Sequence, residues 1–180
     1  MKGAIIYKTK YGATKQYAEW LGAELSLPII ESDDLIEGEL KHYDFLLLGT
    51  PVYIGKFKIA KWLKRNVKNL IKKKVFLFVV AGTSVEETET RSQIILDNVP
   101  QEIKPYCEIY FLKGRVKHSS LSFSDRLLLK MAAAFEKDPA KKRVYIEDMD
   151  GVKRESLEAI LSAVKNYSGK LIASTNSLPI

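Results

Sequence analysis

A short segment near the start of the chain combines the groups that bind anions. Residues 9–14 read Thr-Lys-Tyr-Gly-Ala-Thr and stand between an apolar run and a helical pattern. Gly12 allows a tight turn, the two threonine hydroxyls can donate hydrogen bonds, and the first amides of a helix are unpaired. Because those amides and the helix dipole favour negative charge, the segment is a candidate phosphate site. The alternative is a plain turn that caps the helix.

Two further segments could line a planar ring system. Residues 49–55 read Gly-Thr-Pro-Val-Tyr-Ile-Gly, with a stiffening proline, two glycines that allow close backbone approach and one aromatic side chain, Tyr53. Residues 81–84 read Ala-Gly-Thr-Ser and could face the edge of such a ring with amides and hydroxyls. The alternative for Tyr53 is packing beneath the helix that follows it.

Several common motifs are missing from the sequence. Gly49, Gly55 and Lys56 imitate a Walker A loop, but the glycines are one residue too far apart, and Phe57 stands where a hydroxyl should hold magnesium. No G-x-G-x-x-G follows the first apolar run, and no G-x-S-x-G elbow occurs. The sequence therefore favours neither a P-loop ATPase, nor a Rossmann dehydrogenase, nor a serine hydrolase.

Metal-binding and disulfide-forming residues are scarce. The sequence has one cysteine, Cys107, and two histidines, His42 and His118, which are far apart. These counts predict no metal site and no disulfide framework, and they favour a reducing compartment. His118 could shuttle protons near a ligand, or it could be a plain surface residue.

The elements that must position the three segments follow from the apolar pattern. Continuous apolar runs occur at residues 4–7, 45–48 and 75–80. A fourth run at 107–112 is interrupted only by Glu108, and a weaker run lies at 28–31. Helical spacing of apolar residues follows at 17–25, 59–71, 86–99 and 157–164. Uninterrupted apolar strands are typical of a parallel sheet covered by helices on both faces. We therefore expect an α/β fold in which the three segments meet at the carboxyl ends of strands, where such sheets bind ligands.

One connection is much longer than the usual ~2–6 residues. It lies between the last strand and the last helix, at about residues 115–150, and Leu128, Met131, Ala132 and Phe135 within it have helical spacing. The chain contains no repeat, low-complexity tract or linker that would divide it. We therefore expect a single domain over residues 1–180 with a helical insert.

The three segments resemble the FMN-binding loops of flavodoxin-like proteins, and the resemblance covers nearly the whole chain. It implies a flavodoxin-like three-layer sandwich whose five parallel strands have the order 2-1-3-4-5. It also implies that FMN is bound by three groups of residues: Thr9, Lys10, Tyr11, Gly12, Ala13 and Thr14 at the phosphate; Thr50, Pro51, Val52, Tyr53 and Gly55 along the ring; Ala81, Gly82 and Thr83 on its other side. The Lys-Tyr pair is bulkier than the small polar pair of typical flavodoxins, and the third segment lacks a stacking aromatic.

The insert carries a more specific resemblance. Residues 114–116 and 121–131 are similar to the region before the last helix in menaquinone-dependent protoporphyrinogen dehydrogenases and related flavodoxin domains. This implies an FMN-dependent oxidoreductase that passes electrons from an organic substrate through FMN to a quinone, with no acid–base triad. By location, Arg115, Arg126 and Lys130 could pair with substrate carboxylates. The alternatives are a non-catalytic flavodoxin-type electron carrier and a flavodoxin-fold interaction module without cofactor.

The positive charge of the chain is concentrated in one segment. The sequence holds 29 Lys and Arg against 22 Asp and Glu, and residues 56–74 contain nine basic residues and no acidic one. Such a run is usually a solvated helix face, but it could also bind an anionic membrane surface. No nucleic-acid-binding motif accompanies it, so we expect no nucleic acid partner. The apolar residues of the insert helix could contact a membrane, a quinone or a second copy of the chain.

The start of the sequence has no signal-peptide core, and no apolar run is long enough to span a bilayer. We therefore expect a cytoplasmic protein that could lie at the inner face of the membrane.

Overall fold

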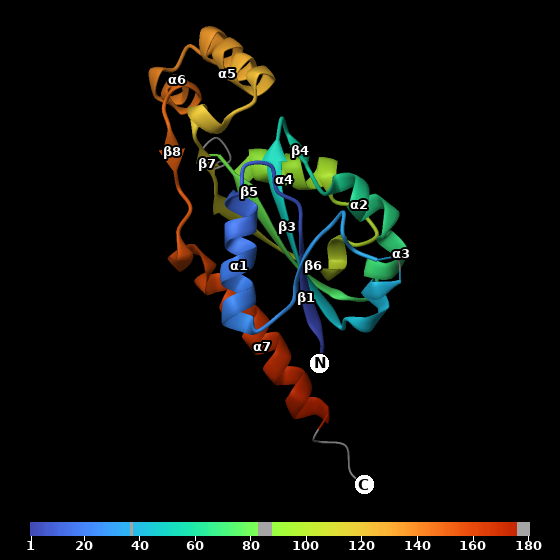
Figure 1. Cartoon of the computed structure of the whole chain (residues 1–180). Coiled ribbons are helices and arrows are strands. Elements are labelled where there is room, and N and C mark those ends of the chain that lie inside the picture. The colour runs from blue at the N-terminus through green and yellow to red at the C-terminus, as the bar shows by residue number, and fades with distance from the viewer. Residues whose placement is uncertain (37, 83–87, 176–180) are drawn as a thin grey trace.

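The computed structural model describes residues 1–36, 38–82 and 88–175. Its parallel strands are β1 (Gly3–Tyr7), β2 (Ile29–Glu31), β3 (Phe45–Tyr53), β5 (Lys74–Ala81) and β6 (Cys107–Lys113). They are arranged in the order β2-β1-β3-β5-β6, and every neighbouring pair runs parallel (Figure 1). Numbered along the chain without the short antiparallel strand, this is the predicted order 2-1-3-4-5, so the sequence-based fold class is confirmed.

Helices cover both faces of this sheet (Figure 1). They are α1 (Ala13–Leu25), α2 (Ala60–Arg65), α3 (Val67–Leu70), α4 (Thr88–Asn98) and α7 (Glu158–Thr175). Successive strand residues point to opposite faces, so each strand contributes to two cores. One core joins α1 and α7 to the sheet through residues such as Ile5, Tyr17, Phe76 and Ile160. The other joins α2, α3 and α4 through residues such as Ile6, Leu63, Leu77 and Ile94.

The predicted helix over residues 59–71 is broken into two short helices. Asn66 ends α2 with its backbone outside the helical region, and its side-chain amide donates to the carbonyl of Trp62 at 3.0 Å. The Trp62 carbonyl also accepts the regular helical bond from the backbone amide of Asn66 at 3.0 Å, so the break is a local change of backbone angles at Asn66, and the apolar spacing continues across it. Short 3-10 turns complete the described chain at Glu39–His42, Lys104–Tyr106, His118–Ser120 and Arg154–Leu157.

The second predicted segment is a strand end and a hairpin, where an open loop was expected. β3 continues to Tyr53, and β4 (Lys56–Phe57) turns back to pair antiparallel with it. Both residues of the connecting turn, Ile54 and Gly55, have positive φ angles, of 50° and 67°. This is the geometry of a two-residue turn that matches the twist of a hairpin.

The insert stands at the carboxyl end of the sheet (Figure 1). Its stem is an antiparallel ribbon of β7 (Arg115–Val116) and β8 (Met149–Asp150), which encloses α5 (Phe123–Phe135) and α6 (Pro139–Ile146). The predicted insert helix is α5. Both ends of the insert are fixed by Tyr17 of α1, whose hydroxyl donates to the carbonyl of Lys113 at 2.9 Å and accepts from the amide of Lys153 at 3.3 Å. Among the described helices, none is long and apolar enough to cross a membrane.

Candidate functional site

A cavity of about 1160 Å³ lies at the carboxyl end of the sheet, beneath the insert. All three predicted segments line it, through Thr9, Lys10, Tyr11, Ala13, Thr14, Pro51, Val52, Tyr53, Gly55, Ala81 and Gly82. Gly12 shapes the first turn without lining the cavity, and Thr50 is fully buried and does not line it either. Thr83 lies outside the described residues.

The first segment forms a tight turn at the N-terminus of α1. Gly12 has a φ of 85° in the left-handed region, and its amide donates to Oγ1 of Thr9 at 3.1 Å. Thr14 is almost fully buried, and its Oγ1 finds no hydrogen-bond partner among the described residues. The first turn of α1 contains no acidic residue. A buried hydroxyl without a partner costs about 1–3 kcal/mol, so its presence beside unpaired helix amides fits a phosphate ligand.

The hairpin of the second segment is held from below by a residue that the sequence analysis did not single out. Asn98 is 2% exposed at the end of α4. Its Oδ1 accepts from the amide of Phe57 at 2.8 Å, and its Nδ2 donates to the carbonyls of Gly55 at 2.9 Å and Ile94 at 2.8 Å. Thr50 supports the same region, since its Oγ1 accepts from the amide of Ile59 at 3.3 Å. The Thr50 side chain therefore has a structural contact, and its predicted contact with the flavin ring stays a prediction.

A cluster at the mouth of the cavity joins the first two segments to the insert. We call it the Asp125 cluster, and it consists of Lys10, Tyr11, Tyr53 and Asp125. The Asp125 carboxylate lies 2.6 Å from Nζ of Lys10, accepts from the Tyr53 hydroxyl at 2.5 Å and also accepts from the Tyr11 hydroxyl. Nζ of Lys10 lies 3.3 Å from the centre of the Tyr53 ring. Tyr53 thus faces the cavity and the insert, not the helix that follows it.

The sequence contained a signal for where Asp125 would lie, although not for its partners. Ser122-x-x-Asp125 is a capping pattern that marks the start of a helix. In the structure Oγ of Ser122 accepts from the amide of Asp125 at 3.2 Å and caps α5. The cap places Asp125 in the first turn of α5, over the two segments.

The charge of Asp125 is strongly stabilised. Burial alone would raise the pKa of its carboxyl, but hydrogen bonds from Lys10, Tyr11 and Tyr53 outweigh burial and lower the pKa to about 2. The same contacts raise the pKa of Lys10 above its ordinary value, although burial opposes this. The cluster is therefore an ion pair at neutral pH.

This pKa shift predicts how the stability of the protein depends on acid. The folded-state pKa lies below the unfolded value of about 3.9, so the stabilisation is complete above pH ~4 and is lost as the pH falls toward 2. The difference in free energy of unfolding between the wild type and Asp125→Asn is expected to shrink across that interval. Urea unfolding at a series of pH values measures it, and a constant difference from pH 6 to pH 2.5 would contradict the assigned ion pair.

The insert supplies an apolar wall to the cavity. Its lining side chains are Val116, Leu121, Leu128, Leu129, Ala132, Tyr145 and Met149. The basic residues considered for substrate carboxylates differ in their surroundings. Arg115 lines the cavity but pairs with Asp150 at 2.7 Å, Arg126 donates to the carbonyl of Leu121 at 3.3 Å, and Lys130 is exposed.

The family of the chain follows from a sequence comparison. A family model described as a flavodoxin domain matches residues 4–143. The chain belongs to the flavodoxin domain family. This membership supports the sequence-based prediction that FMN is the cofactor. A comparison with curated proteins finds no significant match.

Solved structures similar to this flavodoxin domain include an archaeal flavodoxin, with 20% identity, a TM-score of 0.46 and coverage of 63% of this chain and 85% of that one. Oxidised flavodoxin 2 from Bacillus cereus has 20% identity, a TM-score of 0.45 and the same coverage. A flavoprotein in complex with FMN from Lactobacillus acidophilus has 17% identity and a TM-score of 0.44, covering 62% and 91%. Family membership rests on the sequence match and the sheet order, not on these structures.

The flavodoxin domain shows no metal-binding group of three or more ligands within the residues that the structure describes. His118 has both ring nitrogens engaged, with Nδ1 3.0 Å from Asp148 and Nε2 3.0 Å from the carbonyl of Tyr145. These contacts tie the start of the insert to its end.

Cys107 is a free thiol whose pKa is raised by burial to about 11, so it stays protonated at neutral pH.

Proposed function

We propose that this flavodoxin domain binds FMN in the cavity and acts as a redox protein. The observation that carries the proposal is the buried, unpartnered hydroxyl of Thr14 at the cavity-lining N-terminus of α1. Thr9, the amides of residues 10–14 and Thr14 would hold the phosphate. The hairpin and residues 81–82 would flank the ring. When bound, FMN supplies one-electron or two-electron transfer.

The chain's own residues have distinct tasks in this proposal. Gly12, with a φ of 85°, gives the first segment the left-handed turn from which α1 begins. Asn98 holds the hairpin in place beneath the ring position. The apolar side chains of α5 exclude water from the side of the cavity that faces the insert.

We further propose an oxidoreductase that resembles protoporphyrinogen dehydrogenases, with an organic substrate as donor and a quinone as acceptor. Two features support it. The cavity, of about 1160 Å³, lies above the ~300–1,000 Å³ of common ligand pockets, as expected for a site that takes a substrate beside a cofactor. The apolar wall of the insert suits the flat, apolar ring of a quinone and the apolar pyrrole rings of a porphyrinogen.

Two half-reactions test the finer proposal. Under anaerobic conditions, protoporphyrinogen is expected to bleach the visible absorption of the FMN-loaded protein, and a menaquinone analogue to restore it. Failure of both half-reactions, together with rapid electron exchange with a ferredoxin-type protein, would favour the electron carrier. A protein that takes up no FMN would favour the interaction module.

We also propose that residues 56–74 bring the domain to an anionic membrane surface. Seven of the nine basic residues are exposed: Lys56, Lys58, Lys61, Lys64, Arg65, Lys68 and Lys72. The other two are engaged, since Lys73 donates to the carbonyl of Tyr43 and Lys74 pairs with Glu108.

Sedimentation with vesicles of phosphatidylcholine and phosphatidylglycerol tests this surface. Each basic residue near such a surface adds about 1 kcal/mol of attraction, so Lys61→Gln/Lys64→Gln/Lys68→Gln is expected to bind about 100-fold more weakly. Salt should weaken the binding of the wild type. The matched control, Lys2→Gln/Lys41→Gln/Lys165→Gln, removes the same charge elsewhere. Equal losses in both triple variants, or no binding at any salt concentration, would contradict the proposal.

A further inference from the structure

We propose that Asp125 is a positioning residue through which the insert fixes the first segment and the hairpin of the second segment and sets the affinity of the domain for FMN. This rests on the proposed binding of FMN. Asp125 lies 114 residues from Tyr11 and 72 residues from Tyr53 in sequence, and it accepts a hydrogen bond from each. One carboxylate thus connects the first segment, the hairpin and the insert.

The contacts leave little freedom to the segments they join. Asp125 is 5% exposed, and its two oxygens are divided between Tyr53 on one side and Lys10 and Tyr11 on the other. The amide of Ser122 lies 3.4 Å from the Tyr11 hydroxyl and donates to it. The start of α5 is therefore attached to the first segment by side chain and by backbone.

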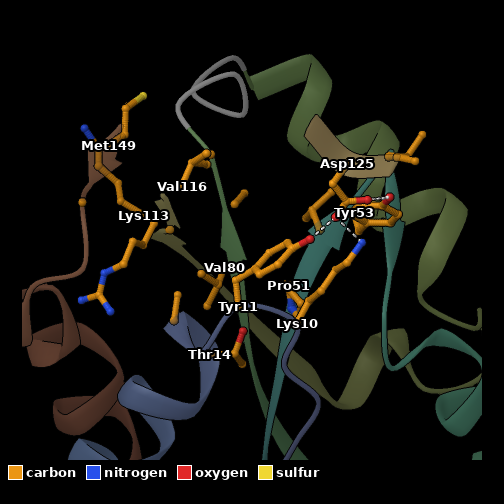
Figure 2. A pocket seen from close by; sticks show the side chains of 18 of the residues that line it. Lys10, Tyr11, Thr14, Pro51, Tyr53, Val80, Lys113, Val116, Asp125 and Met149 are labelled. Atoms are coloured by element: carbon orange, nitrogen blue, oxygen red, sulfur yellow. Dashed lines mark hydrogen bonds and ion pairs between the residues drawn. The ribbon is translucent and has the colours of Figure 1, made fainter. Parts of the chain in front are cut away.

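The Asp125 cluster forms a side wall of the cavity and does not fill it. Figure 2 shows Asp125, Tyr53 and the tips of Lys10 and Tyr11 gathered on one side. Thr14, in the first turn of α1, lies apart from them, while Lys113, Val116 and Met149 lie on the opposite side (Figure 2). FMN could therefore occupy the cavity with the cluster intact. The same arrangement gives a purpose to the bulky Lys-Tyr pair of the first segment, whose side chains reach the insert.

The Asp125 cluster pre-organises the segments that it joins. Segments already held in their binding geometry lose less conformational entropy when the ligand binds. Asp125→Asn removes the charge that pairs with Lys10 and weakens two phenol hydrogen bonds, so the segments become more mobile. Removing one member of a buried ion pair leaves the other uncompensated, whereas replacing both with uncharged groups is often nearly neutral. The double variant Asp125→Asn/Lys10→Met should therefore recover much of what Asp125→Asn loses.

Titration of FMN into the apoprotein, followed by quenching of flavin fluorescence, tests the affinity. We expect Asp125→Asn to weaken binding about tenfold, as for the loss of hydrogen bonds to a charged group, and Tyr53→Phe to weaken it by less. We expect Asp125→Asn/Lys10→Met to recover most of the loss. The matched control is Glu147→Gln, which removes an insert carboxylate that pairs with Arg143 on an exposed face. Unchanged or tighter binding by Asp125→Asn, or strictly additive losses in the double variant, would overturn the proposal.

A measurement without FMN separates this proposal from the proposed function. Hydrogen exchange of the apoprotein is expected to be faster in Asp125→Asn than in the wild type at the amides of residues 9–14 and 52–57, with exchange in β5 unchanged. Equal exchange in both proteins would overturn the positioning role whether or not FMN binds. If the wild type binds no FMN but Asp125→Asn still exchanges faster than the wild type, the proposed function and the claim on affinity are refuted. The attachment of the insert to the two segments then still stands.

Discussion

Thr14→Val is expected to stabilise the protein without FMN and to weaken its binding of FMN. Valine keeps the shape of threonine but removes the buried Oγ1, which has no hydrogen-bond partner among the described residues. Relief from an unsatisfied hydroxyl should raise the free energy of unfolding of the apoprotein by about 1 kcal/mol. Loss of a hydrogen bond to a charged phosphate should lower the affinity for FMN about tenfold.

Thr50→Val is the matched control for this result. Thr50 is as deeply buried as Thr14, but its hydroxyl accepts from the amide of Ile59 and donates to the carbonyl of Pro51. At position 50, the same substitution should therefore lower the free energy of unfolding of the apoprotein. Urea unfolding and FMN titration of both variants give the comparison. A Thr14→Val protein that is less stable and binds FMN as the wild type does would contradict the phosphate assignment.

Asn98→Ala is expected to lower the free energy of unfolding by about 2–4 kcal/mol. The substitution removes three hydrogen bonds, leaves the buried amide of Phe57 without its side-chain partner and frees the part-buried carbonyl of Gly55. Because these groups belong to the hairpin, the loss should also loosen the second segment. Chemical denaturation measures the first effect, and hydrogen exchange of residues 52–57 measures the second.

Asn69→Ala provides the comparison for Asn98. Asn69 is exposed, and its amide makes a single long contact of 3.4 Å to Asn66. Its replacement should change the free energy of unfolding by no more than about 0.5 kcal/mol. Similar effects at positions 69 and 98 would show that Asn98 does not hold the hairpin.

The sheet could be predicted from the sequence because its strands are buried on both faces. Residues 75–80 are apolar without interruption, and in the structure all of them are buried in β5, between β3 and β6 of the parallel sheet. Parallel strands also bring their carboxyl ends to one edge, so the meeting of the three segments followed from the fold. The break at Asn66 did not follow, because the apolar residues on both sides of it pack on the same core and their spacing continues without interruption.

The residues that hold the site in place were harder to predict than the residues that line the cavity. Asn98 lies in a helix with few buried residues. Nothing in the sequence around it marks it as a partner of Phe57 and Gly55, which lie 41 and 43 positions earlier. Asp125 is brought to Tyr11 by the stem of the insert, whose geometry is set by tertiary contacts. Both residues act across long sequence separations, where local patterns carry no signal. Their polar side chains read as surface residues until the packing is known.

Comparison of FMN with riboflavin tests the central claim most directly. The two flavins share the ring, but riboflavin lacks the phosphate that the N-terminus of α1 is proposed to hold. We expect the wild type to bind a single FMN per chain with a visible flavin spectrum, and to bind riboflavin far more weakly. Equal affinity for the two flavins, or binding of neither, would contradict the account.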